Sequence, residues 1–191
     1  KKPYGLAYAN SSDATSGDCN ELKSKLFLRP LEESAAKEVA NVGSFYTSRY
    51  ETKDNIVALV SASSCGTEGE VVWHSKDSGE SYEKIYSADK PESAESLGEQ
   101  ITSLKISSDG KSIVFALLDN AGSKNTVKEV NTETKEVKDL FTVEQRGVFI
   151  SGYDKTNNKI YYFVGCYNCD GNNFNKLYVR DVETDVEEVV F

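Results

Sequence analysis

The sequence predicts an all-β fold of the β-propeller type, made of about four four-stranded antiparallel blades. Short apolar runs follow turns rich in Asp, Asn or Gly, and a second hairpin with alternating apolar and charged residues follows each run. The apolar runs begin at Ile56, Ile113 and Ile160, which are 57 and 47 residues apart. Such spacings are typical of propeller blades.

The first hairpin of each repeat joins a short strand, a polar turn and an apolar run. Its three copies occupy residues 49–60, 105–117 and 153–164. Tight-turn residues between two strand-like runs predict a β-hairpin, and the β-branched and aromatic residues of the runs favour strands.

The second hairpin occupies residues 72–86, 127–141 and 177–191, and an earlier copy occupies residues 26–42. Alternation of apolar and charged residues is typical of strands with one buried face. Residues 32–42 are also compatible with a helical turn, but their register against the other copies favours a hairpin. Residues 91–100 are compatible with one or two helical turns.

These hairpins divide one propeller segment, residues 1–191, into four blades. We expect the blades at residues 1–43, 44–90, 99–144 and 145–191. Residues 4–10 match the second strand of the repeat, so the first blade lacks its innermost strand. We therefore expect either part of a larger propeller or an open array that another chain completes.

One turn resembles the repeat of TolB-type propellers. Residues 107–115 read SSDGKSIVF, in which Ser108 replaces the usual proline of a Ser-Pro-Asp-Gly-Lys turn. Such repeats occur in TolB-like proteins and in the propeller domains of prolyl oligopeptidase-type peptidases. The resemblance implies propeller blades and makes Asp109 and Gly110 structural turn residues.

A second turn resembles the Asp-box of sialidases and related propellers. Residues 75–82 read SKDSGESY, with Ser75, Asp77 and Gly79 at matching places and Tyr82 in place of tryptophan. Asp and Ser side chains hydrogen-bond the local backbone, and Gly supplies a positive φ. The Asp-box of sialidases lies away from their active site, so the resemblance implies a fold and no activity.

Charge and hydropathy exclude several classes of partner. The formal net charge is −9 and the 22 basic residues are scattered, whereas nucleic acids and anionic membranes need clustered Lys and Arg. No apolar run approaches the ~20 residues that span a bilayer. We expect no nucleic-acid partner and no membrane insertion.

The cysteines favour an extracytoplasmic location, meaning secreted, periplasmic or at the cell surface. Their number is even, and Asn10-Ser11-Ser12 forms a glycosylation sequon, which fits an oxidising compartment. We expect disulfides, paired Cys19–Cys65 and Cys166–Cys169. A zinc site at the short Cys-x-x-Cys pair, or free thiols, remain the alternatives.

No recognisable catalytic motif is present. The chain has one histidine, His74, which follows a strand beside the Asp-box-like turn, and it has no Gly-x-Ser-x-Gly elbow. The few arginines fall at different places in the repeat, unlike a sialidase cluster: Arg29, Arg49, Arg146 and Arg180. A glycosidase with two carboxylates stays open. We expect no enzyme, no catalytic residue, no cofactor and no metal.

The loop at residues 165–174 is the candidate binding loop. It offers Tyr167 and Phe174 as aromatic side chains and Asp170 as an acidic one. Asp170, Asn172 and Asn173 offer oxygens for a calcium ion, but they do not match EF-hand spacing. Binding residues often lie on loops that a scaffold holds. We expect a non-catalytic protein-interaction or structural module whose partner is another protein or the rest of a propeller. A glycan-binding or glycosidase-related Asp-box propeller, and the propeller of a secreted prolyl-oligopeptidase-type peptidase, are the alternatives.

Overall fold

The computed structural model describes residues 4–11, 24–30, 37–41, 49–61, 69–78, 81–89, 98–119, 121–144, 147–165 and 176–190. This described part consists of strands and turns without a helix, so it contains no helix that is long and apolar enough to cross a membrane.

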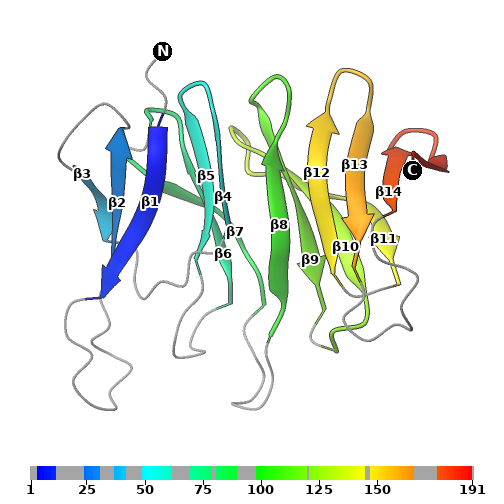
Figure 1. Cartoon of the computed structure of the whole chain (residues 1–191), viewed down its shortest axis with the longest axis horizontal. Coiled ribbons are helices and arrows are strands. Elements are labelled where there is room, and N and C mark those ends of the chain that lie inside the picture. Colours follow the sequence, from blue (N-terminus) through cyan, green and yellow to red (C-terminus); the bar gives the residue numbers. More distant parts are fainter. Residues whose placement is uncertain are drawn as a thin grey trace.

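The strands form four antiparallel sheets, here called blades 1 to 4, which lie side by side in chain order (Figure 1). Blade 1 contains β1 (Tyr4–Ser11), β2 (Ser24–Pro30) and β3 (Lys37–Asn41). Blade 2 contains β4 (Arg49–Lys53), β5 (Ile56–Ser61), β6 (Val71–Ser75) and β7 (Glu83–Ser87). Blade 3 contains β8 (Gln100–Ile106), β9 (Ser112–Leu118), β10 (Asn125–Asn131) and β11 (Val137–Val143). Blade 4 contains β12 (Val148–Asp154), β13 (Lys159–Val164), β14 (Leu177–Asp181) and β15 (Glu187–Val189).

This topology confirms the predicted fold class. Blades 2, 3 and 4 are four-stranded, and each strand pairs with its neighbours in the chain. The described part of blade 1 has three strands and lacks the innermost one, as expected. Residues 37–41 form a strand, so the hairpin prediction there is correct. Of the possible helical turns at residues 91–100, residues 91–97 lie outside the described residues, and Gln100 begins strand β8.

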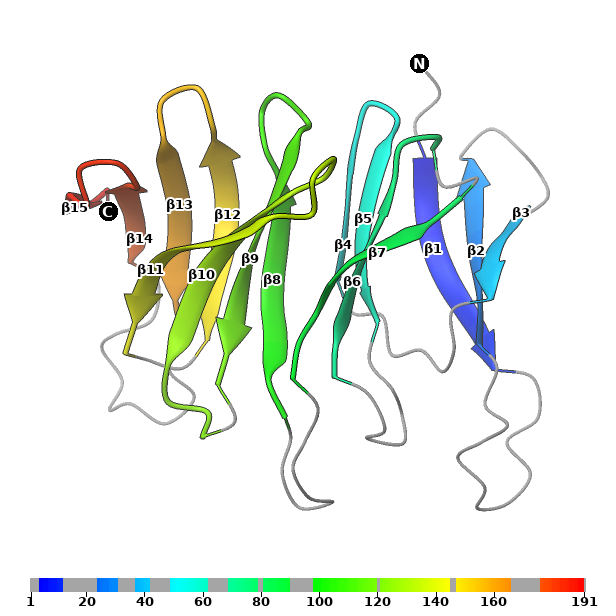
Figure 2. The same ribbon diagram turned by 180° about the vertical axis from the view of Figure 1, so that it is seen from behind.

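The first strands of blades 2, 3 and 4 lie beside one another. Strand β8 contacts both β4 and β12, and Figure 1 shows β8 and β12 at the front of their sheets. The view from behind shows the outer strands β7 and β11 crossing the back of their blades (Figure 2). The sheets therefore pack face to face with their innermost strands along one side.

The core consists of two apolar clusters, one between blades 2 and 3 and one between blades 3 and 4. Strand β9 contributes side chains to both clusters. Ile113, Phe115 and Leu117 belong to the first, whereas Val114 and Ala116 belong to the second. Both faces of this strand are buried, which explains why its sequence is a continuous apolar run.

The three isoleucines that begin the apolar runs do not share one face. Ile56 packs on the cluster between blades 2 and 3, so it faces the following blade. Ile113 and Ile160 instead face the preceding blade. The turns differ in length: Lys53 pairs directly with Ile56, whereas Ile106 pairs with Ile113 across a longer turn. A change of one residue in register moves a strand's side chains to the opposite face.

Candidate functional site: the uncovered face of blade 4

The candidate binding loop lies outside the described residues except for Gly165, as do all four cysteines and Gly79. The disulfides, their pairing and the roles of Tyr167, Asp170 and Phe174 therefore stay predictions. Four predicted turn residues are described: Ser75, Asp77, Asp109 and Gly110.

The turn after β6 closes on the carboxylate of Asp77. The Ser75 hydroxyl donates to Asp77 Oδ1 over 2.7 Å, and the backbone N–H of Ser81 donates to the same oxygen over 2.9 Å. The Ser81 hydroxyl donates to Asp77 Oδ2 over 2.5 Å. This carboxylate is bound to its own turn, a structural arrangement.

The turn between β8 and β9 has a similar arrangement around Asp109. The Ser107 hydroxyl donates to Asp109 Oδ1 over 2.6 Å, and the Lys111 N–H donates over 3.0 Å. Gly110 has a φ of 74°, which glycine adopts without strain. Burial alone would raise the pKa of Asp109, but the hydrogen bonds from Ser107 and Lys111 hold it below its usual value.

His74 lies in the interface between blades 2 and 3. Its side chain is fully buried, and neither ring nitrogen has a hydrogen-bond partner among the described residues. Glu83 Oε1 lies 3.5 Å from Nδ1, while Glu83 Oε2 pairs with Lys135 of blade 3 over 3.1 Å. Burial lowers the pKa of His74, so the ring is neutral at pH 7.

Glu129 links blade 3 to blade 4. The hydroxyl of Tyr153 donates to Glu129 Oε1 over 3.0 Å, and the Lys155 ammonium group forms an ion pair with the same oxygen. Burial would raise the pKa of Glu129, but hydrogen bonds from Lys155, Ser112 and Tyr153 hold it below its usual value. Glu129, Tyr153 and Lys155 line a surface pocket of about 330 Å³.

The innermost strands of blades 3 and 4 approach closely. The Thr102 hydroxyl donates to the Val148 carbonyl over 2.7 Å. The Ile150 N–H donates to the Ser103 hydroxyl over 2.9 Å. A small residue at Ser103 therefore allows the next blade's backbone to come within hydrogen-bond distance.

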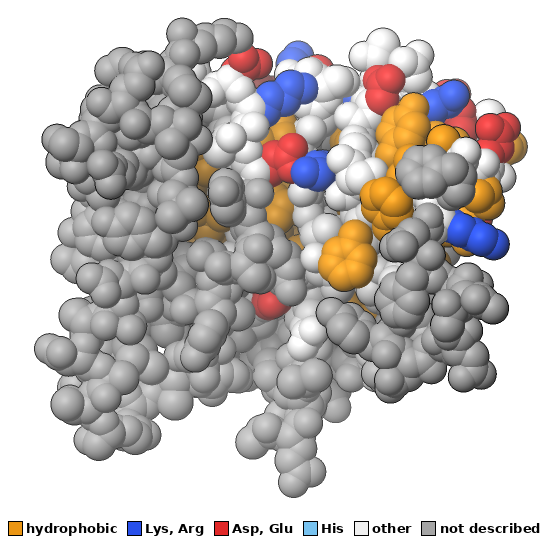
Figure 3. Space-filling view, viewed as in Figure 1, with side chains coloured by type: hydrophobic (Ala, Val, Ile, Leu, Met, Phe, Trp, Pro, Cys, Tyr) orange, Lys and Arg blue, Asp and Glu red, His pale blue; other side chains and the backbone are white. Residues whose placement is uncertain are grey.

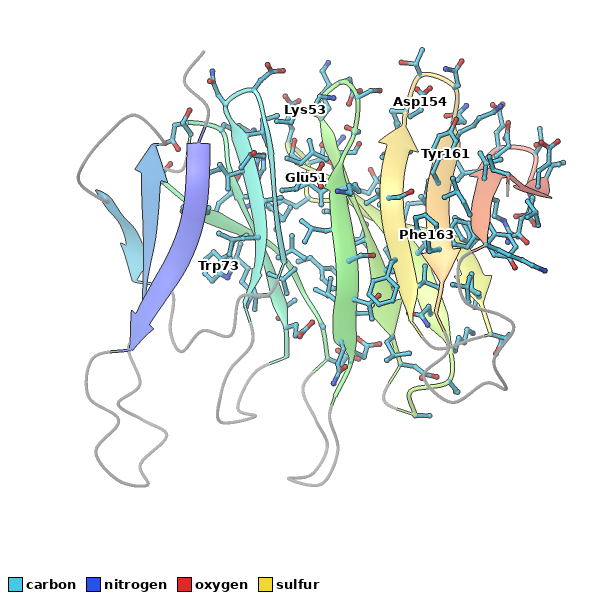
Figure 4. The ribbon with its side chains drawn as sticks, viewed as in Figure 1. Glu51, Lys53, Trp73, Asp154, Tyr161 and Phe163 are labelled. Carbon is cyan, nitrogen blue, oxygen red and sulfur yellow. The ribbon has the colours of Figure 1, made fainter. Side chains whose placement is uncertain are left out.

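Blade 4 buries one face on blade 3, and no sheet of the described part of the chain packs on its other face. Ile160, Tyr162 and Val164 of β13 pack on blade 3, so the alternate residues Tyr161 and Phe163 point away from it. These two rings, labelled in Figure 4, lie on the front of blade 4. Figure 3 shows hydrophobic side chains gathered over β12 and β13 in this region.

We call this surface the aromatic face. The strand register places five residues on it, since residues paired across strands share a face: Phe149, Tyr161, Phe163, Leu177 and Val179. Phe149 is 43% exposed, and the other four are half-buried.

Charged residues of both signs border the aromatic face on the side of β15: Lys159 and Asp181 pair across strands on this face, and Glu188 lies beside them. Glu188 is paired with Val179 and lines a shallow pocket with it. Asp185 and Glu187 both contact Arg180, over 2.6 Å and 3.3 Å. Arg180 pairs with Ile160 and lies over the ring of Phe141 of blade 3, so these ion pairs lie on the opposite face of blade 4, which packs on blade 3.

Sequence reasoning did not single out the aromatic face. The signal for it is present, because blade 4 carries Tyr161 and Phe163 where blade 3 carries Val114 and Ala116. Using this signal requires knowledge of which side of each strand faces the next blade. Within the described residues, no group of three or more His, Cys, Asp or Glu side chains is placed to hold a metal ion.

No family model matches this chain, and no curated protein matches it in sequence. Solved structures match it in fold. The β-propeller domain of the trilobed protease from Pyrococcus furiosus has a TM-score of 0.60 and 18% identity, over 97% of this chain and 53% of that chain. TolB from Acinetobacter baumannii has a TM-score of 0.54 and 11% identity, over 99% of this chain and 43% of that one.

An oligogalacturonate lyase in complex with manganese matches with a TM-score of 0.59 and 16% identity, over 88% of this chain and 42% of that chain. The chain thus spans about half the length, or less, of these structures. At such identities the likeness concerns the fold alone. The protein has the fold of β-propeller blades, similar to those of TolB.

Proposed function

We propose that this chain is a non-catalytic, extracytoplasmic segment of a larger β-propeller and acts as a protein-interaction or structural module. One observation carries the proposal. Blades 2 and 3 bury both faces of their sheets, whereas no described sheet packs on the aromatic face of blade 4, where Phe149 is 43% exposed. A contiguous exposed apolar surface marks a site of association.

The chemistry of the interior interfaces supports a sheet as the partner. Each described interface joins two sheets through apolar side chains, with a few polar links such as Glu129 to Lys155. Covering apolar surface stabilises a protein by about 25 cal/mol per Å². The aromatic face continues this pattern at the next place in the row, so the remaining blades of a propeller suit it.

The described ionisable groups favour a structural role. The carboxylates of Asp77 and Asp109 accept hydrogen bonds from their own turns, and Glu129 is bound by Tyr153 and Lys155. Reactive groups need access to a substrate, whereas these are engaged by neighbours. The four cysteines and the sequon at Asn10 support an extracytoplasmic location.

Hydroxyl-radical footprinting with mass spectrometry tests the proposal. We expect Phe149, Tyr161 and Phe163 to be oxidised readily in residues 1–191. In the protein extended beyond Phe191, the same rings should be protected. Phe115 and Tyr162, which are 0% and 1% exposed, are matched controls that should stay protected in both forms.

Equal oxidation of the aromatic face in both forms would contradict the proposal. Lyase or peptidase activity of residues 1–191 would contradict the non-catalytic role. Oligosaccharide binding that Phe163→Ala abolishes would assign the face to a glycan instead.

A further inference from the structure

The following inference rests on the proposed function and concerns the kind of blade that covers the aromatic face. Strand pairing identifies the same four positions on the forward face of each blade, meaning the face toward the following one. They are Ala58, Val60, Val72 and His74 in blade 2; Val114, Ala116, Val127 and Glu129 in blade 3; and Tyr161, Phe163, Leu177 and Val179 in blade 4.

Both interior interfaces combine small and large residues in one order. The earlier blade presents small side chains on its second strand, and the later blade inserts a large ring. Phe115 of blade 3 packs in the cluster with Ala58 and Val60 of blade 2. Tyr162 of blade 4 packs in the same manner in the cluster with Val114 and Ala116.

The residues that meet at these interfaces are fully buried. Ala58, Val114 and Ala116 are 0% exposed, and Phe115 and Tyr162 are 0% and 1% exposed. Tyr162 is further packed between two rings, with centroids 5.4 Å from Phe141 and 5.5 Å from Tyr178. Close packing of this kind tolerates little added volume.

Blade 4 carries large side chains on its forward face where blades 2 and 3 carry small ones. Its forward face carries Tyr161 and Phe163 at the positions of Val114 and Ala116. On the innermost strand, Phe149 pairs with Phe163 as Ser103 pairs with Ala116. The ring of Phe149 thus takes the place of Ser103, whose hydroxyl accepts a hydrogen bond from the backbone N–H of Ile150 in the next blade.

We propose that the aromatic face receives the next blade of the same polypeptide, and that this blade carries glycine, alanine or serine at the position of Phe115 and Tyr162. An aromatic ring at that position would clash sterically with Tyr161 and Phe163, whereas a small residue would leave space for these two side chains. The continuing polypeptide is the source of this blade because the matched propellers extend well beyond the part that this chain covers.

The large side chains of the aromatic face determine which kind of blade can pack on it. A blade built like blade 3 or blade 4 would clash with it, and interfaces gain specificity from such clashes. The following blade also needs no ionic group opposite the third strand of blade 4. On that strand, Val179 occupies the position that His74 and Glu129 hold in blades 2 and 3. The blade that follows blade 4 therefore carries a small residue at the position of Phe115 and Tyr162 on its facing strand.

A double-mutant cycle in the protein extended beyond Phe191 tests this inference. Replacing the small facing residue of the next blade by leucine should lower the Tm by about 3–10 °C, because the added volume overfills the interface. Phe163→Ala in the same protein should recover most of that loss. Val137→Ala serves as the matched control, because Val137 lies on β11 and is 39% exposed; it should recover nothing.

The outcomes separate the two proposals. If footprinting finds the aromatic face protected but the facing residue is leucine, isoleucine or an aromatic residue, the inference is overturned and the proposed function stands. An unchanged Tm in the leucine variant also overturns the inference. If the rings are oxidised equally in both forms, the proposed function and the inference fail together.

Discussion

Replacing His74 with leucine should stabilise the protein at neutral pH. The side chain is fully buried, and both ring nitrogens lack a hydrogen-bond partner among the described residues. Each unmade buried hydrogen bond costs about 1–3 kcal/mol. Leucine removes both polar atoms at similar volume, and its imperfect shape costs up to about 1.5 kcal/mol. Val179 occupies the equivalent position in blade 4, so this place in the repeat accepts an apolar residue.

We expect a net gain of about 1–2 kcal/mol at pH 7.5, or a rise in Tm of about 2–6 °C. The same variant should be less sensitive to acid. Burial lowers the pKa of His74 in the folded protein, so the unfolded chain takes up a proton first as the pH falls below about 6.5. As far as His74 is concerned, the wild type is thus most stable above this pH, and it loses stability as the pH falls toward the folded-state pKa.

At pH 5 the wild type has lost at most about 2 kcal/mol of its free energy of unfolding through this group. Each pH unit below about 6.5 contributes at most about 1.4 kcal/mol. Glu83, 3.5 Å from the ring, limits the loss because it favours the protonated form. Urea unfolding at pH 7.5 and pH 5 measures both effects as differences from the wild type. His74→Gln is the matched control: it should lose the titration without gaining stability at pH 7.5.

The reasoning fails if His74→Leu is less stable than the wild type at pH 7.5 by more than about 1 kcal/mol. It also fails if the leucine variant keeps the pH dependence of the wild type. The first result would mean that the ring makes favourable contacts which leucine cannot replace. The second would assign the pH dependence to other groups.

Two further predictions concern a turn and the cysteines. Gly110→Ala should destabilise the protein by about 1–3 kcal/mol in urea unfolding, because φ is 74° and an added Cβ would lie 2.7 Å from Ile56 Cδ1; stability equal to the wild type would refute this. Intact mass after alkylation without reduction should show no added label, since we expect every cysteine in a disulfide; four labels would exclude that state for Cys19, Cys65, Cys166 and Cys169.

The sequence predicted the hairpins because their signals are local. Turn residues such as Asp109 and Gly110 lie between strand-like runs, and their hydrogen bonds stay within the turn. Alternation likewise located the outer hairpins, in which β11 is mostly exposed. Strand order then follows from the chain, since each strand pairs with its neighbours.

The contacts between blades could not be predicted in this way. Glu129 and Lys155 are 26 residues apart, and their pairing depends on how blade 4 packs on blade 3. Both faces of β9 are buried, so its apolar run does not reveal which residues face forward. Turn lengths add to the difficulty, because they place Ile56 and Ile113 on opposite faces.

The charged residues beside the aromatic face have a consequence for the behaviour of the protein before that face is covered. Exposed aromatic rings on a sheet favour association between identical copies, and charged neighbours on the same face oppose it. Two copies that met through this face would bring Lys159, Asp181 and Glu188 of each copy into the contact. Burying charged groups costs free energy unless each finds a partner of opposite charge. These three residues thus disfavour self-association of the polypeptide through its aromatic face.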